Sequence, residues 1–408
     1  MISVEKAVQI VLDSIHILDP MTVPILGARG RILAEDIISA ENVPANDIAT
    51  LNGYALRADD IVQASSNQPV ELTLVGDLAP GQKLAEPLKA KQAVRIITGT
   101  SIPKSADSVL PEEHAVRQSS KKLLVYKSSG SGEFIRNRGE DIAQGALVLP
   151  KGKKLNAADI GLLSEIGYSE VMCYRQPRVS FLTSGQGIAD SGGPLSNEIS
   201  GPSSRYTLYS QLAEYGAEPV DLGLAGISRE EVSTKIIEGL EYDMFVSTVG
   251  QSMDDFTNVK KMLEQIGMDI KFWRVALKPA KPFIFGMVGD IPIFGLMGHP
   301  FSFYIIMEQF IRPALMKMMG SKIVKRTEVK AILTRDLKSE NGVTSFMRGV
   351  VTLTESGFTV SPELKKPNSI KAFSVANGLI VIPAHSGYMS AGTKVTVQII
   401  GEPEVELS

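Results

Sequence analysis

Short hydrophobic runs alternate with longer amphipathic stretches between Pro177 and Met319. Short apolar runs are typical of buried strands, and apolar residues at every third or fourth position are typical of helices packed on one face. Strands that alternate with helices form parallel sheets covered on both faces, so this region predicts a doubly wound α/β domain. We expect strands at 178–183, 219–223, 243–248, 270–275, 283–288 and 291–294, and helices at 204–215, 228–240, 255–266 and 300–319.

Two other regions carry short β-rich runs separated by proline and glycine turns, the pattern of small β domains. The runs lie at 71–76, 93–97, 108–110 and 122–126 in one region, and at 328–334, 344–351, 378–383 and 393–400 in the other. Helical patterns are found at residues 3–16, where Ser3 is the N-cap candidate, and at residues 156–167. The predicted fold class is therefore α/β plus β, with several domains. They are an extended linker domain at 1–42 and 135–172, an inserted small β domain at 43–134, the α/β domain at 173–322, and a C-terminal β-barrel or sandwich domain at 323–408.

Composition narrows the class of protein. The 408 residues are 44% hydrophobic, enough for several cores, and the net charge is −3. Neither sign of charge forms a long run, so we expect no nucleic-acid partner. No apolar run reaches the roughly 18 residues of a membrane span, and Met1–Lys6 lacks the basic region of a signal peptide. One cysteine and four scattered histidines argue against a disulfide or cysteine-rich metal site. We expect a cytoplasmic protein without a membrane partner.

The clearest candidate for chemistry is the segment 277–282, in which Lys278 and Lys281 stand beside Pro279 and Pro282. Each proline fixes its own backbone and restricts the residue before it, so the two ammonium groups have a stiff support. Two cations held in this way suit a multiply charged anion such as a phosphate. The alternative interpretation is a surface turn with two solvated lysines.

Open α/β sheets bind ligands beyond the carboxyl ends of their strands. The loops that leave the predicted ends are 184–202, 249–255 and 297–302, and all are rich in glycine, serine and polar residues. Gly298-His299-Pro300 opens a long helix, whose first amide groups favour anions. The sequence has neither G-x-G-x-x-G nor the lysine signature of a phosphate loop, so an ordinary dinucleotide or triphosphate site is not supported.

Six motifs follow one another in an order similar to that of the molybdopterin molybdotransferases, the family that includes the E domain of gephyrin. No single motif is decisive, but six in family order make chance a poor explanation, and the chain is identified as a member of that family. The motifs are Gly30-Arg31-Ile-Leu-Ala-Glu-Asp-Ile38; Val43-Pro44 leading to Asn52-Gly53-Tyr54-Ala55; Arg95-Ile-Ile-Thr98-Gly99; Arg138-Gly139-Glu140-Asp141-Ile142; Leu277-Lys278-Pro279-Ala280-Lys281-Pro282; and Asn377-Gly378-Leu-Ile-Val-Ile-Pro383.

The resemblance implies a homodimer whose cleft joins the α/β and C-terminal domains of one protomer to the small β domain of the other. It implies adenylylated molybdopterin and molybdate as substrates, Mg²⁺ as cofactor, hydrolysis that releases AMP, and insertion of molybdenum at the dithiolene. Other cofactor-assembly proteins are candidate partners. By the same resemblance, Asn52, Asp141 and Asp255 are assigned to catalysis, Asp254 and Asp255 to the metal, and Lys278, Lys281, Thr98, Ser184, Gly185, Gln186, Gly250, Ser252, Gly298 and His299 to substrate binding.

Carboxylates are where the chain departs from the family pattern. Asn52 stands where the family has aspartate, and Gln186 and Gly187 replace two acids. A neutral amide is a weaker Mg²⁺ ligand than a carboxylate and cannot act as a general base. Two such losses imply a rate lowered by several orders of magnitude, at about tenfold per 1.4 kcal/mol. Since both lysines are kept, the anion-binding half of the site is better preserved than its acidic half.

Three functions stay open from the sequence. The first is an enzyme that inserts molybdenum or tungsten, and the second is a catalytically impaired paralogue that acts as a pterin-binding or scaffold dimer. The third and most distant is an enzyme acting on another nucleotide-linked anion. Structural roles compete at single residues too: a salt bridge beside Arg138 for Asp141, a helix N-cap for Asp255, and plain solvent exposure for Arg205.

Overall fold

A computed structural model of the protein describes residues 1–184, 203–225, 229–249, 253–297, 300–363 and 373–406. The chain divides into two compact units. The first contains residues 1–34, 152–156 and 171–408, and the second contains residues 35–151 and 157–170. The predicted boundaries of the four domains stay predictions, because the two units group the chain more coarsely.

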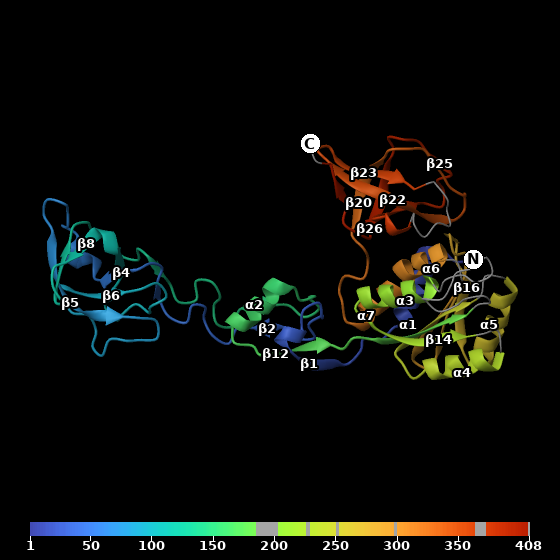
Figure 1. The fold of residues 1–408 in the computed structure, drawn as a ribbon, viewed down its shortest axis with the longest axis horizontal. Helices are drawn as coiled ribbons and strands as arrows, with labels where there is room; N and C mark the ends of the chain where they lie inside the picture. Colours follow the sequence, from blue (N-terminus) through green and yellow to red (C-terminus); the bar gives the residue numbers. More distant parts are fainter. Residues whose placement is uncertain (185–202, 226–228, 250–252, 298–299, 364–372, 407–408) are drawn as a thin grey trace, which may run out of the picture. The chain divides into compact units, whose positions relative to one another are not determined.

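The second unit is built on a six-stranded sheet with the order β7-β4-β6-β5-β9-β8 (Figure 1). Strand β4, which the sequence patterns missed, is central and entirely buried, and it carries most of the Asn-Gly-Tyr-Ala motif. A Cβ at Gly53 would lie 2.1 Å from the carbonyl oxygen of Leu110, so this close approach of strands requires glycine. The strands are β4 (Gly53–Leu56), β5 (Val70–Leu78), β6 (Gln92–Ile96), β7 (Ser108–Pro111), β8 (Ala115–Arg117) and β9 (Lys122–Val125).

Short strand pairs connect the ends of this sheet to the rest of the chain. Strand β3 pairs with β10 and β2 pairs with β11, both antiparallel.

Helix α1, in the first unit, is capped as predicted, because the Ser3 hydroxyl accepts a hydrogen bond from the amide of Lys6 at 3.2 Å. The elements are α1 (Val4–Ser14), β1 (Pro20–Pro24), β2 (Ile37–Ile38), β3 (Ile48–Ala49), β10 (Ile135–Arg136), β11 (Leu147–Leu149), α2 (Ala157–Glu165) and β12 (Glu170–Tyr174).

The first unit holds the predicted α/β domain, with a six-stranded sheet in the order β14-β13-β15-β19-β18-β16. Neighbouring strands run parallel from β14 to β19, and β18 is antiparallel to both of its neighbours. The mainly parallel, doubly wound sheet is therefore confirmed. Its strands are β13 (Arg178–Ser184), β14 (Glu218–Ala225), β15 (Met244–Val249), β16 (Asp269–Arg274), β18 (Pro282–Val288) and β19 (Ile291–Met297).

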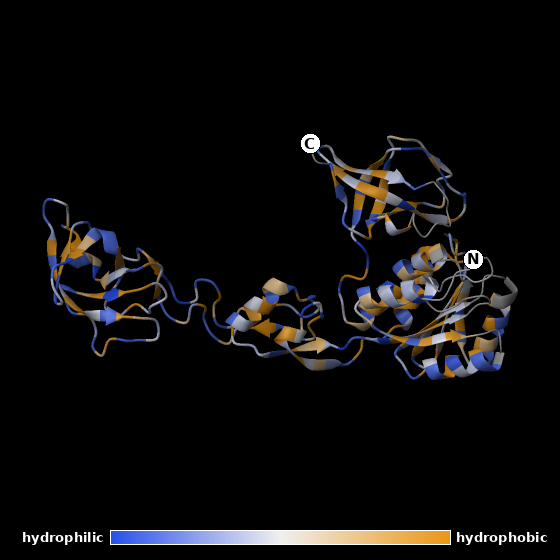
Figure 2. Ribbon diagram, in the orientation of Figure 1, coloured by the Kyte–Doolittle hydropathy of each residue, from blue (hydrophilic) through white to orange (hydrophobic). Residues whose placement is uncertain are grey.

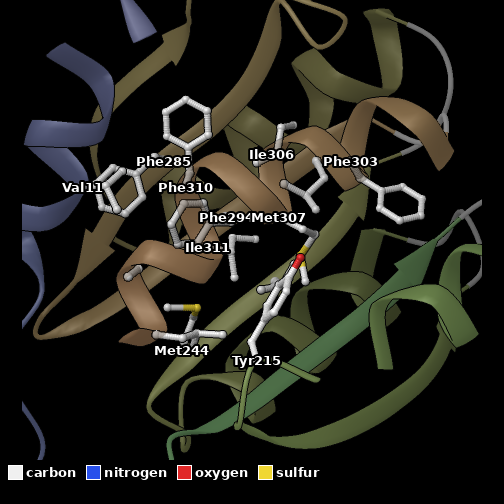
Figure 3. Packing of buried hydrophobic residues seen from close by; sticks show 14 of the residues in the cluster. Val11, Tyr215, Met244, Phe285, Phe294, Phe303, Ile306, Met307, Phe310 and Ile311 are labelled. Carbon is white, nitrogen blue, oxygen red and sulfur yellow. The ribbon is translucent and has the colours of Figure 1, made fainter. Parts of the chain in front are cut away.

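Helices cover both faces of this sheet because its strands are apolar on both sides. Phe181 packs in one hydrophobic cluster with α1, α3, α6 and α7, whereas the next residue, Leu182, packs in another with α4 and α5. Figure 3 shows the first cluster, with Val11 beside Phe285 and Phe310. Along the helices, hydrophilic and hydrophobic residues alternate (Figure 2). The helices are α3 (Ser203–Glu214), α4 (Arg229–Gly239), α5 (Met253–Gln265), α6 (Pro300–Ile306) and α7 (Arg312–Met318).

The helix predicted at 300–319 is interrupted by a π-helical turn, η4 (Met307–Ile311), between α6 and α7. The amide of Arg312 bonds to the carbonyl of Met307, five residues back. Pro313 explains the irregularity, since it has no amide to donate to the carbonyl four residues before it. Glu308, which lies in this turn, is buried and accepts three hydrogen bonds. Arg326 donates two of them, both at 2.9 Å, and the Tyr215 hydroxyl donates the third, at 2.8 Å.

Five strands of the C-terminal domain pair in a closed ring, so the domain is a barrel and not a sandwich. The ring runs β22-β23-β20-β26-β24, and β24 pairs again with β22. Closure leaves these five strands with no free edge between them. The strands are β20 (Glu328–Leu333), β22 (Thr344–Thr354), β23 (Gly357–Pro362), β24 (Gly378–Ile382) and β26 (Lys394–Ile399), with β21 (Leu337–Lys338), β25 (Tyr388–Met389) and β27 (Glu404–Val405) beside them.

The Asn377-Gly378 motif has a structural explanation in the barrel. The side-chain oxygen of Asn377 accepts a hydrogen bond from the backbone amide of Val351 at 2.6 Å. Its side-chain nitrogen donates to the backbone carbonyls of Val351 and Glu402, both at 3.0 Å. A Cβ at Gly378 would lie 2.4 Å from a methyl group of Val351. This buried side chain therefore holds the start of β24 against β22, where the ring closes.

We predict that Asn377→Ala destabilises the barrel by about 1–3 kcal/mol, because it leaves the buried amide and carbonyl of Val351 without partners. Hydrogen exchange of the β22 amides should become faster, by about tenfold for each 1.4 kcal/mol lost. Asn67→Ala, at an exposed position of the other unit, serves as the control and should leave β22 unchanged. Unchanged exchange in Asn377→Ala would contradict this role.

Candidate functional site

The segment with the two lysines is a closed, strained turn. Strand β17 (Leu277–Lys278) leads into it, and the amide of Val275 donates to the carbonyl of Lys281 at 3.1 Å, which closes the turn. Ala280 has a φ of +83°, a left-handed conformation that costs a non-glycine residue free energy. Such strain persists only where the surroundings enforce it, and it is concentrated at ligand sites. The stiff support expected for the lysines is present.

The turn is joined to the barrel by main-chain pairing. Strand β17 runs parallel to the start of β22, with Leu277 opposite Thr344 and Lys278 opposite Ser345. The amide of Thr344 also donates to the carbonyl of Ala276 at 3.0 Å. Leu277 is completely buried and Lys278 is exposed, as alternation along a strand requires. The lysine turn is therefore fixed to the C-terminal domain as well as to the α/β domain.

Both lysines converge on one carboxylate, that of Glu340. The Nζ atom of Lys281 lies 2.5 Å from Oε1 of Glu340, and the Nζ atom of Lys278 lies 3.4 Å from Oε2. The hydrogen bonds from Lys281 and Lys278 hold the pKa of the Glu340 carboxyl below its usual range. All three side chains stay partly exposed, between 41% and 52%, so an ion from solution has access to them.

Glu340 is itself held by its backbone. It lies in the turn between β21 and β22, where the amide of Ser339 donates to the carbonyl of Gly387 at 2.9 Å. The amide of Gly342 donates to the carbonyl of Ala384 at 2.7 Å, and the hydroxyls of Ser339 and Ser345 are 2.8 Å apart. Because both turns are anchored, the fold brings the backbones of Glu340 and of the two lysines near one another, and their side chains complete the contact.

Strands β13 and β15 end at the point where the order of the sheet reverses, the usual ligand position in such sheets. Thr183 and Thr248 are paired there, and both are 1% exposed. The Thr183 hydroxyl has no hydrogen-bond partner among the described residues, which is rare for a buried polar group and suits a ligand contact. The side chains of Ser184, Asp254 and Asp255 lie outside the described ones, as do residues Gly185, Gln186, Gly250, Ser252, Gly298 and His299.

In the second unit, two of the predicted residues contact each other. The Asn52 side-chain oxygen accepts a hydrogen bond from the Thr98 amide at 2.9 Å, and both side chains are exposed. The amide of Gly99 donates to the carbonyl of Ala49 at 2.9 Å, which fixes the same loop. An aspartate at position 52 would accept this hydrogen bond equally well. The amide therefore preserves the loop while removing one negative charge.

Asp141 forms a salt bridge, with Arg136 and not with the neighbouring Arg138 named from the sequence. Its Oδ2 atom accepts from Arg136 Nη2 at 2.8 Å, while the amide of Arg138 donates to Asp47. Arg136 lies in β10, whose pairing with β3 sets this arrangement. Similarly, Arg205 contacts Asp221 at 2.7 Å. The sequence could not show these partners, because they depend on which segments pair.

A magnesium site is not formed by the acids that the structure describes. Among the described residues, no group of three or more histidine, cysteine, aspartate or glutamate side chains is placed to hold a metal ion. Glu340 is paired with two lysines and Asp141 with an arginine, so neither offers the negative surroundings that a hard cation needs.

Two charged residues near the site were missed from the sequence. Glu340 has no motif around it, and only the pairing of β17 with β22 brings it to the lysines. Arg348 of β22 is 3% exposed. The Cζ atom of its guanidinium lies 4.5 Å from the ring centre of Phe301, in α6, and 5.8 Å from that of Phe373. Burial lowers the pKa of its guanidinium. A buried cation beside the first turn of α6 is a further candidate for contact with an anion.

Family models match nearly the whole chain in domain order. The MoeA N-terminal region (domain I and II) matches residues 2–167, the probable molybdopterin binding domain matches 195–317, and the MoeA C-terminal region (domain IV) matches 330–400. The molybdopterin molybdenumtransferase of Haemophilus influenzae is 32% identical over 375 residues, 91% of each chain. The chain belongs to the molybdopterin molybdenumtransferase family.

Other relatives agree. The molybdopterin molybdenumtransferase of Bacillus subtilis is 30% identical over 377 residues, which cover 91% of this chain and 88% of that one. The crystal structure of a molybdopterin biosynthesis MoeA protein from Pyrococcus horikosii matches with a TM-score of 0.86 and 28% identity, over 98% of this chain and 100% of that one. The family expected from the six motifs is confirmed.

None of the described helices is long and apolar enough to span a membrane.

The contact of Lys281 with Glu340 predicts a pH dependence. A carboxyl pKa below its usual 4.5 means that the contact stabilises the fold at neutral pH and is lost only as the pH falls through that lowered pKa. In Lys281→Met the pKa of Glu340 should rise, because the main cause of its lowering is removed. NMR titration of labelled glutamate measures this, with Lys330→Met of β20 as the control. An unchanged pKa in Lys281→Met would show that the contact is absent in solution.

Proposed function

We propose that the protein is a molybdenumtransferase of molybdenum cofactor biosynthesis, which inserts molybdenum from molybdate into adenylylated molybdopterin and releases AMP. The observation that carries the proposal is the convergence of Lys278 and Lys281 on a single carboxylate in a rigid turn. Two ammonium groups that meet around one anion are suited to the pyrophosphate linkage of such a substrate. The relatives are named molybdopterin molybdenumtransferases, which supports transfer of molybdenum to molybdopterin. The adenylylated substrate and the release of AMP are part of the proposal.

Each side chain has a proposed part in this reaction. The two lysines neutralise the pyrophosphate, which favours attack of water on the phosphoanhydride bond and departure of AMP. The Thr183 hydroxyl, which has no partner among the described residues, is proposed to contact further oxygens of the substrate. The same role is proposed for Ser184, Gly185, Gln186, Gly250, Ser252, Gly298 and His299. Thr98, in the small β domain, and Asp141, in the linker domain, act from the other protomer.

Asp254 and Asp255 are the proposed Mg²⁺ ligands, since among the other candidate acids Asp141 is paired with an arginine, as Glu340 is with two lysines. When bound, the ion would stabilise negative charge that develops on the substrate oxygens. Asp255 would then contact the metal, and Asn52 would position the Thr98 loop through its hydrogen bond. We further propose that the protein works in the cytoplasm, next to other proteins of cofactor assembly.

A homodimer completes the proposed cleft. Support comes from large apolar side chains that are exposed in the described part of the chain, since contact with a second copy would remove such surface from water. In the first unit Leu26 is 90% exposed, Ile17 53% and Met21 44%, and in the second Leu147 is 55% exposed and Ile38 42%.

The second candidate function is a pterin-binding or scaffold dimer without turnover. Its support is Asn52, whose side-chain oxygen bonds to the Thr98 amide and whose neutral amide cannot act as a base. Gln186 adds a second neutral residue where the family pattern has an acid. This candidate keeps the two lysines and the dimer, and it differs from the first only in the chemical step.

Turnover separates these two candidates. With adenylylated molybdopterin, Mg²⁺ and molybdate, we expect AMP release well above the rate without protein. Lys278→Met together with Lys281→Met should lower the rate by about 10²-fold or more, because a lost charge contact to the reacting phosphate costs about 3 kcal/mol. Lys330→Met, on the outside of the barrel, is the matched control.

The reverse result would point to the scaffold. AMP release at background in the wild type, restored by Asn52→Asp combined with Gln186→Asp, would remove the enzyme from consideration. If the wild type turns over robustly, the scaffold function is unnecessary.

If the protein is a homodimer, analytical ultracentrifugation of the wild type should give the mass of two chains. Leu26→Asp should shift the equilibrium towards monomer by at least about tenfold, because burying an unpaired charge in an interface costs more than 1.4 kcal/mol. Ile237→Asp, at an exposed position of α4, should have no effect. A monomeric wild type would contradict the proposed two-chain cleft.

A further inference from the structure

Glu340 occupies the place where an anion would bind. Its carboxylate oxygens lie 2.5 Å from Lys281 Nζ and 3.4 Å from Lys278 Nζ, the contacts that a phosphate oxygen would make with the same lysines. An anion that approached with Glu340 in place would meet a like charge between the two cations. Each ammonium group has three protons, so the conflict comes from repulsion between two anions held close to the same pair of cations. Ligand and Glu340 are therefore in competition.

The contacts are suited to exchange. Exposed ion pairs contribute little to stability, typically about 0–1 kcal/mol each, so breaking them costs little. The backbones on both sides are anchored, by the β17–β22 pairing and by the hydrogen bonds of Ser339 and Gly342, so only side chains need to move. Rotation of the Glu340 side chain towards solvent would leave the lysines in place for a ligand.

We propose that Glu340 is an internal counter-ion that positions Lys278 and Lys281 in the ligand-free protein and is displaced by the anionic group of the substrate. It thereby sets the affinity of the site, which is weaker than the two lysines alone would provide. The inference rests on the proposed anion binding by these lysines. It assigns a role to a residue of the barrel, in a turn that the sequence motifs do not include.

Binding of pyrophosphate to the full-length protein tests this role by calorimetry. Glu340→Gln should bind pyrophosphate about three- to tenfold more tightly than the wild type, because the competing charge is gone while the shape is kept. The gain should shrink between about 0.1 M and 1 M salt, since it arises from charge. It should also disappear when Lys281→Met is added.

Glu355→Gln is the matched control. Glu355 is an exposed carboxylate in the tight turn between β22 and β23, at the opposite end of β22 from the lysine turn. The same loss of charge there should leave pyrophosphate affinity unchanged. A general change in net charge would instead affect both variants alike.

Two other results of the pyrophosphate measurements would overturn the proposal. If Glu340→Gln weakens binding or leaves it unchanged while Lys278→Met and Lys281→Met abolish it, the lysines bind the anion but Glu340 is not a displaced counter-ion. If pyrophosphate binds equally well to both lysine variants, or to no variant at all, the proposed anion site fails and the role of Glu340 fails with it.

Discussion

The pairing of β17 with β22 is the constraint on which the rest of the site depends. Two residues of the lysine turn run parallel to the first two residues of the longest barrel strand. This pairing binds a strained turn of the α/β domain to the closed ring of the C-terminal domain. Because Lys278 pairs with Ser345 in this register, the lysine turn lies next to the β21–β22 turn, and both lysines reach Glu340.

Charged residues that the sequence singled out are paired with opposite charges in the structure. Lys278 and Lys281 share Glu340, Asp141 is paired with Arg136, and Arg205 with Asp221. Each pair is at least partly open to solvent, where screening keeps its contribution to stability small. Such pairs hold charged side chains in defined positions and still allow a ligand to exchange for one partner.

Much of the fold followed from the sequence, because hydrophobic periodicity reports directly on burial. All six strands and all four helices expected between Arg178 and Met319 are present. What periodicity could not give was the partner of each strand. Choosing a barrel over a sandwich required the return pairing of β24 with β22, and β4 was missed because its four residues form too short a run. The π turn at Met307–Ile311 also escaped notice, although Pro313 was its signal.

The site was predictable in part for the same reason. The prolines around Lys278 and Lys281 correctly indicated a stiff turn, since proline acts on its local backbone. Glu340 lies 59 residues from Lys281 in sequence and is brought to it by tertiary structure alone. Local rules carry no information about such a contact. The assignments of Asp254, Asp255 and the glycine-rich loops stay predictions, since their side chains lie outside those described.

The most direct measurement is a crystal structure of the protein with adenylylated molybdopterin. We predict pyrophosphate oxygens within hydrogen-bond distance, about 2.7–3.2 Å, of the Nζ atoms of both Lys278 and Lys281, with the Glu340 carboxylate turned away from them. A ligand bound elsewhere, with both lysines still on Glu340, would contradict it.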